Sequence, residues 1–263
     1  MKQGFCRSAV VATGMALCLG GCATVEQPDP LEKLNRKTFA FNETVDQYLI
    51  APPARVYRDV VPSVARQGID NFFNNLRDVW SAFNLILQGR FADSANDVMR
   101  FGTNSVFGIV GFVDWASELG LAPHYEDFGQ TLGVWGFDAG AYLVLPVLGP
   151  SSARDAVGLP VDLLASPDQI VESVRLRNAL TGLRVINTRA GLLDATGLLD
   201  DIALDKYSFV RDAYLQRRRS LVEDGKRRDA AAAEEDYVPD EPAAAASAPA
   251  SSPASAPAPQ VRP

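Results

Sequence analysis

Apolar residues recur at helical spacing from residue 31 onward, and this pattern predicts a succession of amphipathic helices. The first helix should have Asp29 as its N-cap and Pro30 in its first turn, and it should end at Pro52 and Pro53. Its apolar face alternates spacings of three and four residues, which is typical of one side of a helix. That face comprises Leu31, Leu34, Thr38, Phe41, Val45 and Tyr48.

Further segments carry the same period. A second helix is expected over residues 62–87, with a break at Gly89, and a third over residues 92–107. Helical periodicity returns over residues 167–199, and a last helix is expected from about residue 205 to residue 222. The apolar face of the third helix comprises Ala95, Val98, Met99, Phe101 and Val106.

Alternation at period two is scarce, so the predicted fold class is all-α. Glycine is frequent between residues 101 and 149, and we expect short helices joined by turns there, with a mobile loop over residues 133–146. Ser152 and Asp155 then form a capping box that starts another helix. The last helix should turn the following residues inward: Phe209, Val210, Ala213, Tyr214 and Leu221.

The N-terminus has the layout of a secretory signal peptide over residues 1–21. Lys2 and Arg7 precede an apolar stretch that ends in small residues and Cys22. A Leu-Gly-Gly-Cys ending resembles the bacterial lipobox, whose cysteine is diacylated and becomes the first residue of the mature protein. Cys22 is therefore the expected lipid anchor, followed by a tether over residues 22–28. The alternative is an ordinary signal peptide with an incidental cysteine.

Lipidation would fix the location of the chain. Each buried acyl CH₂ contributes roughly 0.8 kcal/mol, so two or three acyl chains give a durable membrane anchor. The residue after the cysteine is Ala23, where an aspartate would retain a lipoprotein at the inner membrane. We therefore expect the periplasmic leaflet of a Gram-negative outer membrane.

The segment after the predicted helices has a different composition. Residues 225–263 are mostly Ala, Pro, Ser and acidic residues, which cannot bury enough apolar surface to order themselves. We expect a disordered tail, following a helical domain over residues 29–224. An inert tail is favoured over one that reaches peptidoglycan or another protein.

Charge and cysteine content narrow the possible functions. The formal charge of −7 becomes −9 once the two basic residues of the signal are removed, which argues against nucleic acid as a partner. Two of the three cysteines leave with the signal, so no disulfide is expected. No apolar run beyond the signal is long enough to span a membrane. The shorter runs at residues 83–87, 106–115 and 141–148 are either core or interfacial segments.

The residues needed for catalysis are missing from the sequence. His124 is the only histidine, and its neighbour Pro123 suggests a surface loop. It cannot build a zinc site alone, and no G-x-S-x-G motif accompanies it. The segment 149–152 could hold a phosphate at a helix start, but a plain turn and cap is favoured. We expect no enzymatic activity, no metal and no cofactor.

Several motifs, in order, resemble the MlaA (VacJ) family of outer-membrane lipoproteins. The matching stretches are D-P-L-E-K-L-N-R-K-T-F-A-F-N at 29–42, E-D-F-G-Q-T-L-G at 126–133, L-P-V-L-G-P-S-S-A-R-D at 145–155, T-R-A-G-L-L-D at 188–194, and residues 207–218. The resemblance covers about residues 29–219. Its structural motif residues are Asp29, Pro30, Asn35, Arg36, Phe41, Asn42, Arg154 and Asp155.

The resemblance implies a ring of amphipathic helices around a channel, seated in the inner leaflet beside a trimeric porin. Such proteins are thought to withdraw misplaced phospholipids from the outer leaflet and pass them to a soluble periplasmic carrier of the MlaC type. A glycine-rich hairpin loop shapes the channel. The corresponding residues here are Gly133, Gly136, Phe137, Asp138, Gly140 and Tyr142.

Some alternatives remain open at this point. Trp80, Trp115 and Trp135 suit either the headgroup boundary of a membrane or an ordinary core. Phe41 and Asn42 are expected to pack the ring, with direct lipid contact as the alternative. A structural lipoprotein that braces porins or the envelope, and a membrane-bound lipase, are the competing functions.

Overall fold

The computed structural model describes residues 29–166 and 171–235, with side chains as far as residue 228. The predicted signal peptide, Cys22 and its tether, and residues 236–263 lie outside the described residues. The helices are α2 (Glu32–Val45), the π-helix η1 (Asp46–Ile50), α3 (Ala51–Val60), α4 (Ser63–Leu87), α5 (Phe91–Val106), α6 (Trp115–Glu118), α7 (Phe128–Val134), α8 (Ala153–Ala165), α9 (Val174–Ile202) and α10 (Lys206–Glu235).

The all-α prediction is confirmed, with one small hairpin as the exception. Strand β1 (Tyr142–Leu145) pairs antiparallel with β2 (Gly149–Ser152), and Tyr142 lies opposite Ser152. The loop expected over residues 133–146 is therefore shorter than predicted. Gly133 lies in α7 and Tyr142 is buried in β1, which leaves only residues 135–141 between these elements.

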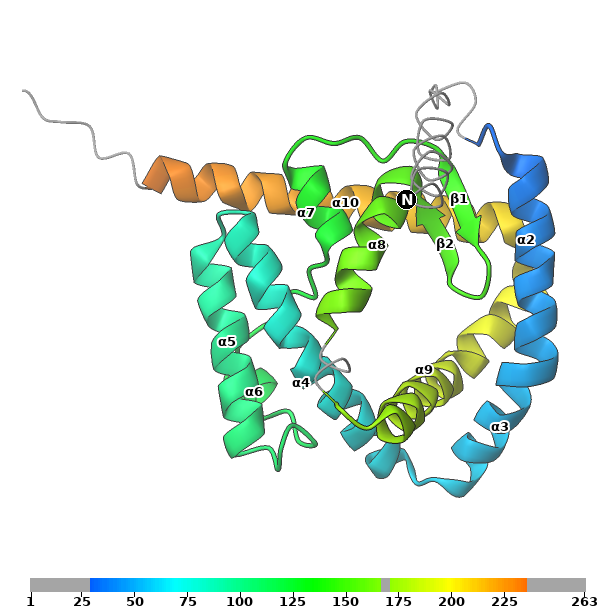
Figure 1. Ribbon diagram of the computed structural model, residues 1–263, viewed down its shortest axis with the longest axis horizontal. Coiled ribbons are helices and arrows are strands. Elements are labelled where there is room, and N and C mark those ends of the chain that lie inside the picture. The colour runs from blue at the N-terminus through cyan, green and yellow to red at the C-terminus, as the bar shows by residue number, and fades with distance from the viewer. Residues whose placement is uncertain (1–28, 167–170, 236–263) are drawn as a thin grey trace, which may run out of the picture.

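The elements close a circuit of contacts (Figure 1). Along this circuit α3 packs on α9, α9 on α4, α4 on α7, and α7 on α8 and α10. The hairpin then contacts α8, α10 and, through β1, the first helix α2. Side-chain hydrogen bonds reinforce it: Tyr57 Oη of α3 donates to Asn187 Oδ1 of α9 over 2.6 Å.

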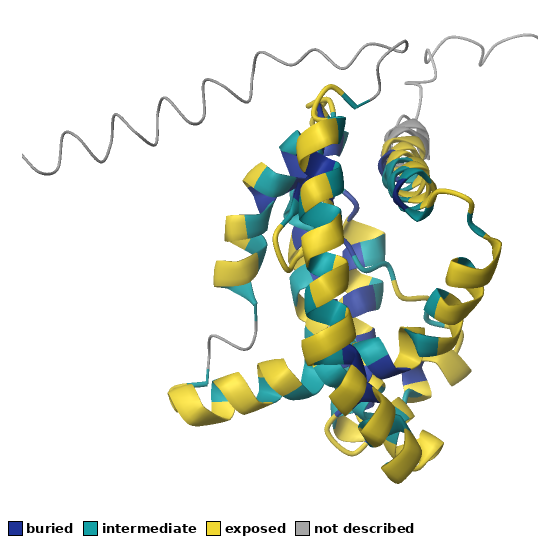
Figure 2. Ribbon diagram, turned by 90° about the vertical axis from the view of Figure 1, so that its right-hand side faces the viewer, coloured by how far each residue is buried: buried dark blue, intermediate teal, exposed yellow. Residues whose placement is uncertain are grey.

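The distribution of apolar residues is inverted relative to a soluble domain. Figure 2 shows that few residues are buried. Most of the buried residues are polar or charged. The one apolar cluster of buried residues within the described residues comprises Tyr142, Val144 and Tyr207, with Phe39, Tyr214 and Leu215 packed against it. Many large apolar side chains face outward instead, which in a monomer marks a surface covered by lipid or protein.

The helical hairpin of α4 and α5 shows this inversion most clearly. Val98, Met99 and Val106, predicted to be the apolar face of the third helix, are exposed. The face that α5 turns toward α4 carries Ser94, Asp97, Arg100 and Asn104. Phe41 of α2 is likewise 52% exposed, and Phe209 of α10 is exposed rather than inward. The apolar face of α5 was predicted correctly, but the inward direction expected for Phe209 was wrong, because the sequence does not state which solvent surrounds the helices.

Helix ends were predicted with mixed success. The starts at Ser63 and, through the Ser152 cap, at Ala153 are confirmed; the Asp155 N–H donates to Ser152 Oγ over 3.2 Å. Leu31, not Asp29, occupies the N-cap position of α2.

Two other helix ends also differ from prediction. Pro52 and Pro53 do not end a helix but form the first turn of α3, since early positions need no backbone donor. Helix α10 continues to Glu235, past the tail boundary expected at residue 225, where alanine favours helix.

Candidate functional site: a polar pocket and its hairpin

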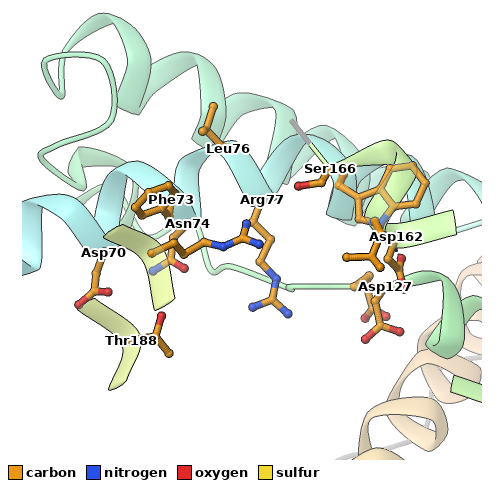
Figure 3. Close-up of a pocket in the computed structure, with 13 residues that line it drawn as sticks. Asp70, Phe73, Asn74, Leu76, Arg77, Asp127, Asp162, Ser166 and Thr188 are labelled. Atoms are coloured by element: carbon orange, nitrogen blue, oxygen red, sulfur yellow. Dashed lines mark hydrogen bonds between the residues drawn. The ribbon is translucent and has the colours of Figure 1, made fainter. Parts of the chain in front are cut away.

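A pocket of about 370 Å³ lies between α4, α8 and α9 (Figure 3). Helix α4 supplies Phe73, Arg77 and Trp80, which share one helical side at spacings of four and three. Its remaining lining is mixed in character: Asp70, Asn74, Leu76, Glu126, Asp127, Asp162, Leu163, Ser166, Arg184 and Thr188. Polar and apolar groups therefore meet in one cavity.

A second pocket of about 240 Å³ adjoins the first, because Asp127 and Asp162 line both. The hairpin forms one wall of it through Leu145, Leu148 and Pro150. The hairpin therefore borders the second pocket, which shares Asp127 and Asp162 with the larger one.

One arginine of α10 ties the walls of these pockets together. Arg218 donates through Nη2 to Asp127 Oδ1 at 2.9 Å and through Nε to Asp155 Oδ2 at 2.9 Å. Arg154 and Tyr214 also donate to Asp155. Burial disfavours both charged carboxylates, but the Arg218 guanidinium outweighs it and holds the pKa of Asp127 and Asp155 below the usual range. Asp127 is also the N-cap of α7, so this partly buried ion pair fixes the start of that helix.

Residues 27–221 match the family model described as MlaA lipoprotein. The chain belongs to the MlaA lipoprotein family. Relatives named intermembrane phospholipid transport system lipoprotein MlaA include those of Haemophilus influenzae, 32% identical over 84% of this chain and 92% of the relative, and Escherichia coli K12, 36% identical over 84% and 90%.

A solved structure supports the same assignment. It was described in work on the structural basis for maintenance of bacterial outer membrane lipid asymmetry, and it is 36% identical in sequence. It superposes with a TM-score of 0.64 over 74% of this chain and 98% of that chain. The MlaA fold therefore extends over nearly the whole described region.

Two asparagines of the first MlaA motif hold the hairpin. Asn35 donates to the carbonyl of Tyr142 and accepts from the N–H of Val144, both at 2.9 Å. Asn42, two turns later, donates to the carbonyl of Leu145 at 2.9 Å and accepts from the N–H of Val147 at 2.7 Å. These residues act as structural clamps on β1, a pairing that sequence could not give because the partners are more than 100 residues apart.

Other MlaA motif residues join the first helix to the last. Asp29 accepts from Asn35 and from the hydroxyl of Tyr207. Arg36 pairs with Asp205 at 2.6 Å and lies 4.4 Å from the centre of the Tyr207 ring. Pro30 belongs to the turn that precedes α2. These contacts join the start of the described chain to α10.

The loop between α7 and β1 is exposed over Gly136, Phe137 and Asp138. Gly136 and Gly140 have φ angles of 99° and 67°, in the left-handed region that favours glycine. Nothing lies within 4 Å of a Cβ built at Gly136, whereas one built at Gly133 would meet Arg154 and Val222 at 2.6 and 2.7 Å. Gly136 and Gly140 therefore serve backbone conformation, and Gly133 serves close packing of α7 on α10.

The turn after α5 presents apolar side chains in an unusual backbone conformation. Ile109 and Val110 have φ angles of 53° and 58°, which is rare for β-branched residues, and they are 72% and 64% exposed. Trp115, Phe107 and Leu119 are exposed nearby. No helix in the described part of the chain is both long and apolar enough to span a membrane. Such a tip suits partial insertion into one leaflet.

The polar interior of the α4–α5 hairpin was not predicted. Arg100, 2% exposed, pairs with Asp78 at 3.2 Å and Asp114 at 3.3 Å. His124, expected on a surface loop, is mostly buried and lies 2.7 Å from Asp97. The sequence did hold a signal for this interior, since polar residues recur at spacings of three and four along α5.

Proposed function

We propose that this chain is an outer-membrane lipoprotein that removes mislocalised phospholipids from the outer leaflet and passes them to a periplasmic carrier of the MlaC type. The observation that carries the proposal is the inverted burial, with polar groups inside and apolar groups outside. A phospholipid headgroup needs a polar path through the protein. A protein seated in a membrane needs an apolar outer surface. The names of the relatives point in the same direction.

The two adjoining pockets are the proposed route for the phospholipid. They combine charged groups with Phe73, Trp80 and Leu163, which suits a molecule with a charged head and apolar chains. The loop at Gly136 and Gly140 is proposed to gate this route, because glycine permits the backbone rotation that a hinge requires.

The transport proposed here makes and breaks no bond. His124, the only histidine of the chain, is hydrogen-bonded to Asp97 and lies 3.3 Å from Asp93, so its ring is held in a structural contact. Within residues 29–166 and 171–235 no group of three or more His, Cys, Asp and Glu could hold a metal. These features favour transport over the lipase alternative.

The proposal includes an acyl anchor on Cys22, in the periplasmic leaflet, beside a trimeric porin. The exposed apolar tip at Ile109 and Val110 supports seating in lipid. Residues 22–28 are the proposed tether between this anchor and the fold.

The test is a deletion and complementation experiment that measures surface-exposed phospholipid. Cells lacking the protein should accumulate phospholipid in the outer leaflet, and the wild type should restore normal levels. Cys22→Ser should fail to restore them, while Cys18→Ser, a matched change within the signal, should succeed. Envelope defects without phospholipid accumulation would favour a bracing lipoprotein, and full rescue by Cys22→Ser would contradict the anchor.

A further inference from the structure

Arg77 is a cation without a carboxylate partner among the described residues. Its guanidinium contacts the carbonyl of Tyr125 at 3.5 Å and lies 4.9 Å from the centre of the Tyr125 ring. By contrast, Arg90, Arg100 and Arg218 each pair with two carboxylates. Arg77 therefore keeps most of its five N–H donors available to a ligand.

The position of Arg77 is suited to binding an anion. Figure 3 shows its side chain reaching into the middle of the pocket. The Arg77 side chain is open to water in the pocket but is surrounded by protein. This burial, together with the charges of Arg217 and Arg184, lowers the pKa of Arg77. A bound anion would offset both the burial of the charge and the repulsion by the other arginines. A guanidinium also matches the oxygens of a phosphate in a two-point contact.

Asp162 is the corresponding anion on α8. Trp80 Nε1 and the Phe128 N–H both donate to its Oδ1, at 2.8 and 2.9 Å. Its Oδ2 accepts no hydrogen bond, and no cation lies within ion-pair distance, among the described residues. Burial raises the pKa of Asp162, and the charge of Asp127 raises it further. Figure 3 shows Asp162 and Asp127 close together, on the same side of Arg77.

The other carboxylates of the pocket are engaged elsewhere. Asp127 pairs with Arg218, and Glu126 pairs with Arg90 at 2.8 Å. Asp70 accepts from Asn187 and lies on the far side of Arg77 from Asp162. Arg77 and Asp162 therefore offer the pocket a positive and a negative group that form no salt bridge among the described residues, with Phe73 and Trp80 also in the lining.

We propose that this pocket is a headgroup site for phospholipids that carry both a phosphate and an ammonium group, with Arg77 holding the phosphate and Asp162 the ammonium. The inference rests on the proposed transport function and adds a preference among its substrates. A volume of about 370 Å³ admits a headgroup and glycerol but not two acyl chains, which must leave the pocket toward apolar surroundings.

The experiment uses the full-length lipidated protein, re-isolated from detergent micelles containing equal amounts of phosphatidylethanolamine, phosphatidylglycerol and diacylglycerol. The retained lipids are then quantified. Wild type should retain the ethanolamine lipid most and diacylglycerol least. Arg77→Gln should reduce both phospholipids about tenfold relative to diacylglycerol, and Arg77→Lys should reduce them less. Asp162→Asn should lower the ethanolamine lipid to the level of phosphatidylglycerol.

Two controls keep the charge changes comparable. Arg55→Gln and Asp59→Asn, at exposed positions of α3 outside the pocket, should leave the lipid ratios unchanged. Asparagine at 162 retains an oxygen for Trp80 and Phe128, and melting temperatures check that each variant folds. Unchanged ratios in Arg77→Gln, or an ethanolamine preference that survives in Asp162→Asn, would overturn the assignment.

Inorganic phosphate distinguishes the two sources of the phosphate group. Added phosphate should fail to displace phospholipid from the wild type, since the site is shaped for a headgroup with attached glycerol. Displacement at concentrations similar to those of the lipid would indicate a site for free phosphate and overturn the proposal. Wild type re-isolated without any phospholipid would instead contradict the transport function itself.

Discussion

Asn42 accepts a hydrogen bond of 2.7 Å from the backbone N–H of Val147, so the first helix holds the tip of a hairpin 105 residues later in the chain. Val147 has a φ angle of 67°, which is strained for a β-branched residue. The amide of Asn42 therefore stabilises a turn whose backbone conformation is unfavourable for Val147.

Replacing Asn42 with alanine should release this turn. Two hydrogen bonds are lost, and we expect a decrease of about 1–3 kcal/mol in the free energy of unfolding. Amide hydrogen exchange at Val147 should accelerate more than exchange within α4. Thr44→Ala, two residues further along the same helix, removes an exposed hydroxyl that bonds only within that helix and is the control. Equal exchange at Val147 in both variants would refute the clamp.

Alanine at Gly136 or Gly140 should change transport more than stability. Each position has positive φ, so a Cβ costs about 1–2 kcal/mol and restricts rotation. Outer-leaflet phospholipid should rise in cells that carry either variant at normal protein levels. Gly120 has a φ of 80° and open space around it, so Gly120→Ala imposes the same backbone cost elsewhere. A rise of the same size with Gly120→Ala would show that strain alone, not hinging, is responsible.

The α4–α5 interior should lose stability as pH rises. Burial raises the pKa of Asp78 to about 7, although Arg100 lies 3.2 Å away; Asp97 and Asp114 raise it further. Asp78 Oδ1 has no hydrogen-bond partner within the described residues, which fits a carboxyl that keeps its proton. The folded state then binds more protons than the unfolded state between about pH 4 and about pH 7, so increasing pH destabilises it.

Asp78→Asn isolates this effect. The melting temperature of the variant minus that of the wild type should increase from acidic to mildly alkaline pH, because only the wild type must ionise a buried carboxyl. Asp59→Asn changes an exposed aspartate on α3 and should give a flat difference. A flat difference for Asp78→Asn as well would contradict the raised pKa.

Asparagine at Ile109 or Val110 should separate membrane contact from folding. Asparagine tolerates the left-handed conformation, so the fold should become no less stable. Each lost apolar side chain should weaken vesicle binding of the unlipidated Cys22→Ser form by about tenfold. Val56→Asn, at an exposed apolar position of α3 with ordinary helical backbone, is the comparison. Unchanged binding in the Ile109 and Val110 variants would exclude this tip as an insertion site.

The sequence predicted local features well and orientation poorly. Pro62 and the Ser152 cap marked helix starts correctly, because capping depends on neighbouring residues. Val98 and Met99 were assigned correctly to one apolar face of α5, but Phe209 of α10 was expected on the inner side and is exposed. Hydrophobic periodicity gives a direction only when the surroundings are known to be water.

For the candidate site, too, the sequence identified residues but not their contacts. The motif residues Asn35, Asn42 and Asp155 were identified from the sequence, but their partners lie far away in the chain and only the fold shows them. Arg77 and Asp162 carried no local signal at all. They become notable only in the fold, where both line one pocket and neither forms a salt bridge among the described residues, whereas Asp127 and Glu126 beside them pair with arginines.

The contacts of Asp29 with Tyr207 and of Arg36 with Asp205 fasten the earliest described residues to the last helix. These partners lie some 170 residues apart in the chain, so the circuit can close only after nearly all of the folded region has been synthesised. A product that ends before residue 205 would lack α10 and both of these contacts, and its polar interior would stay open.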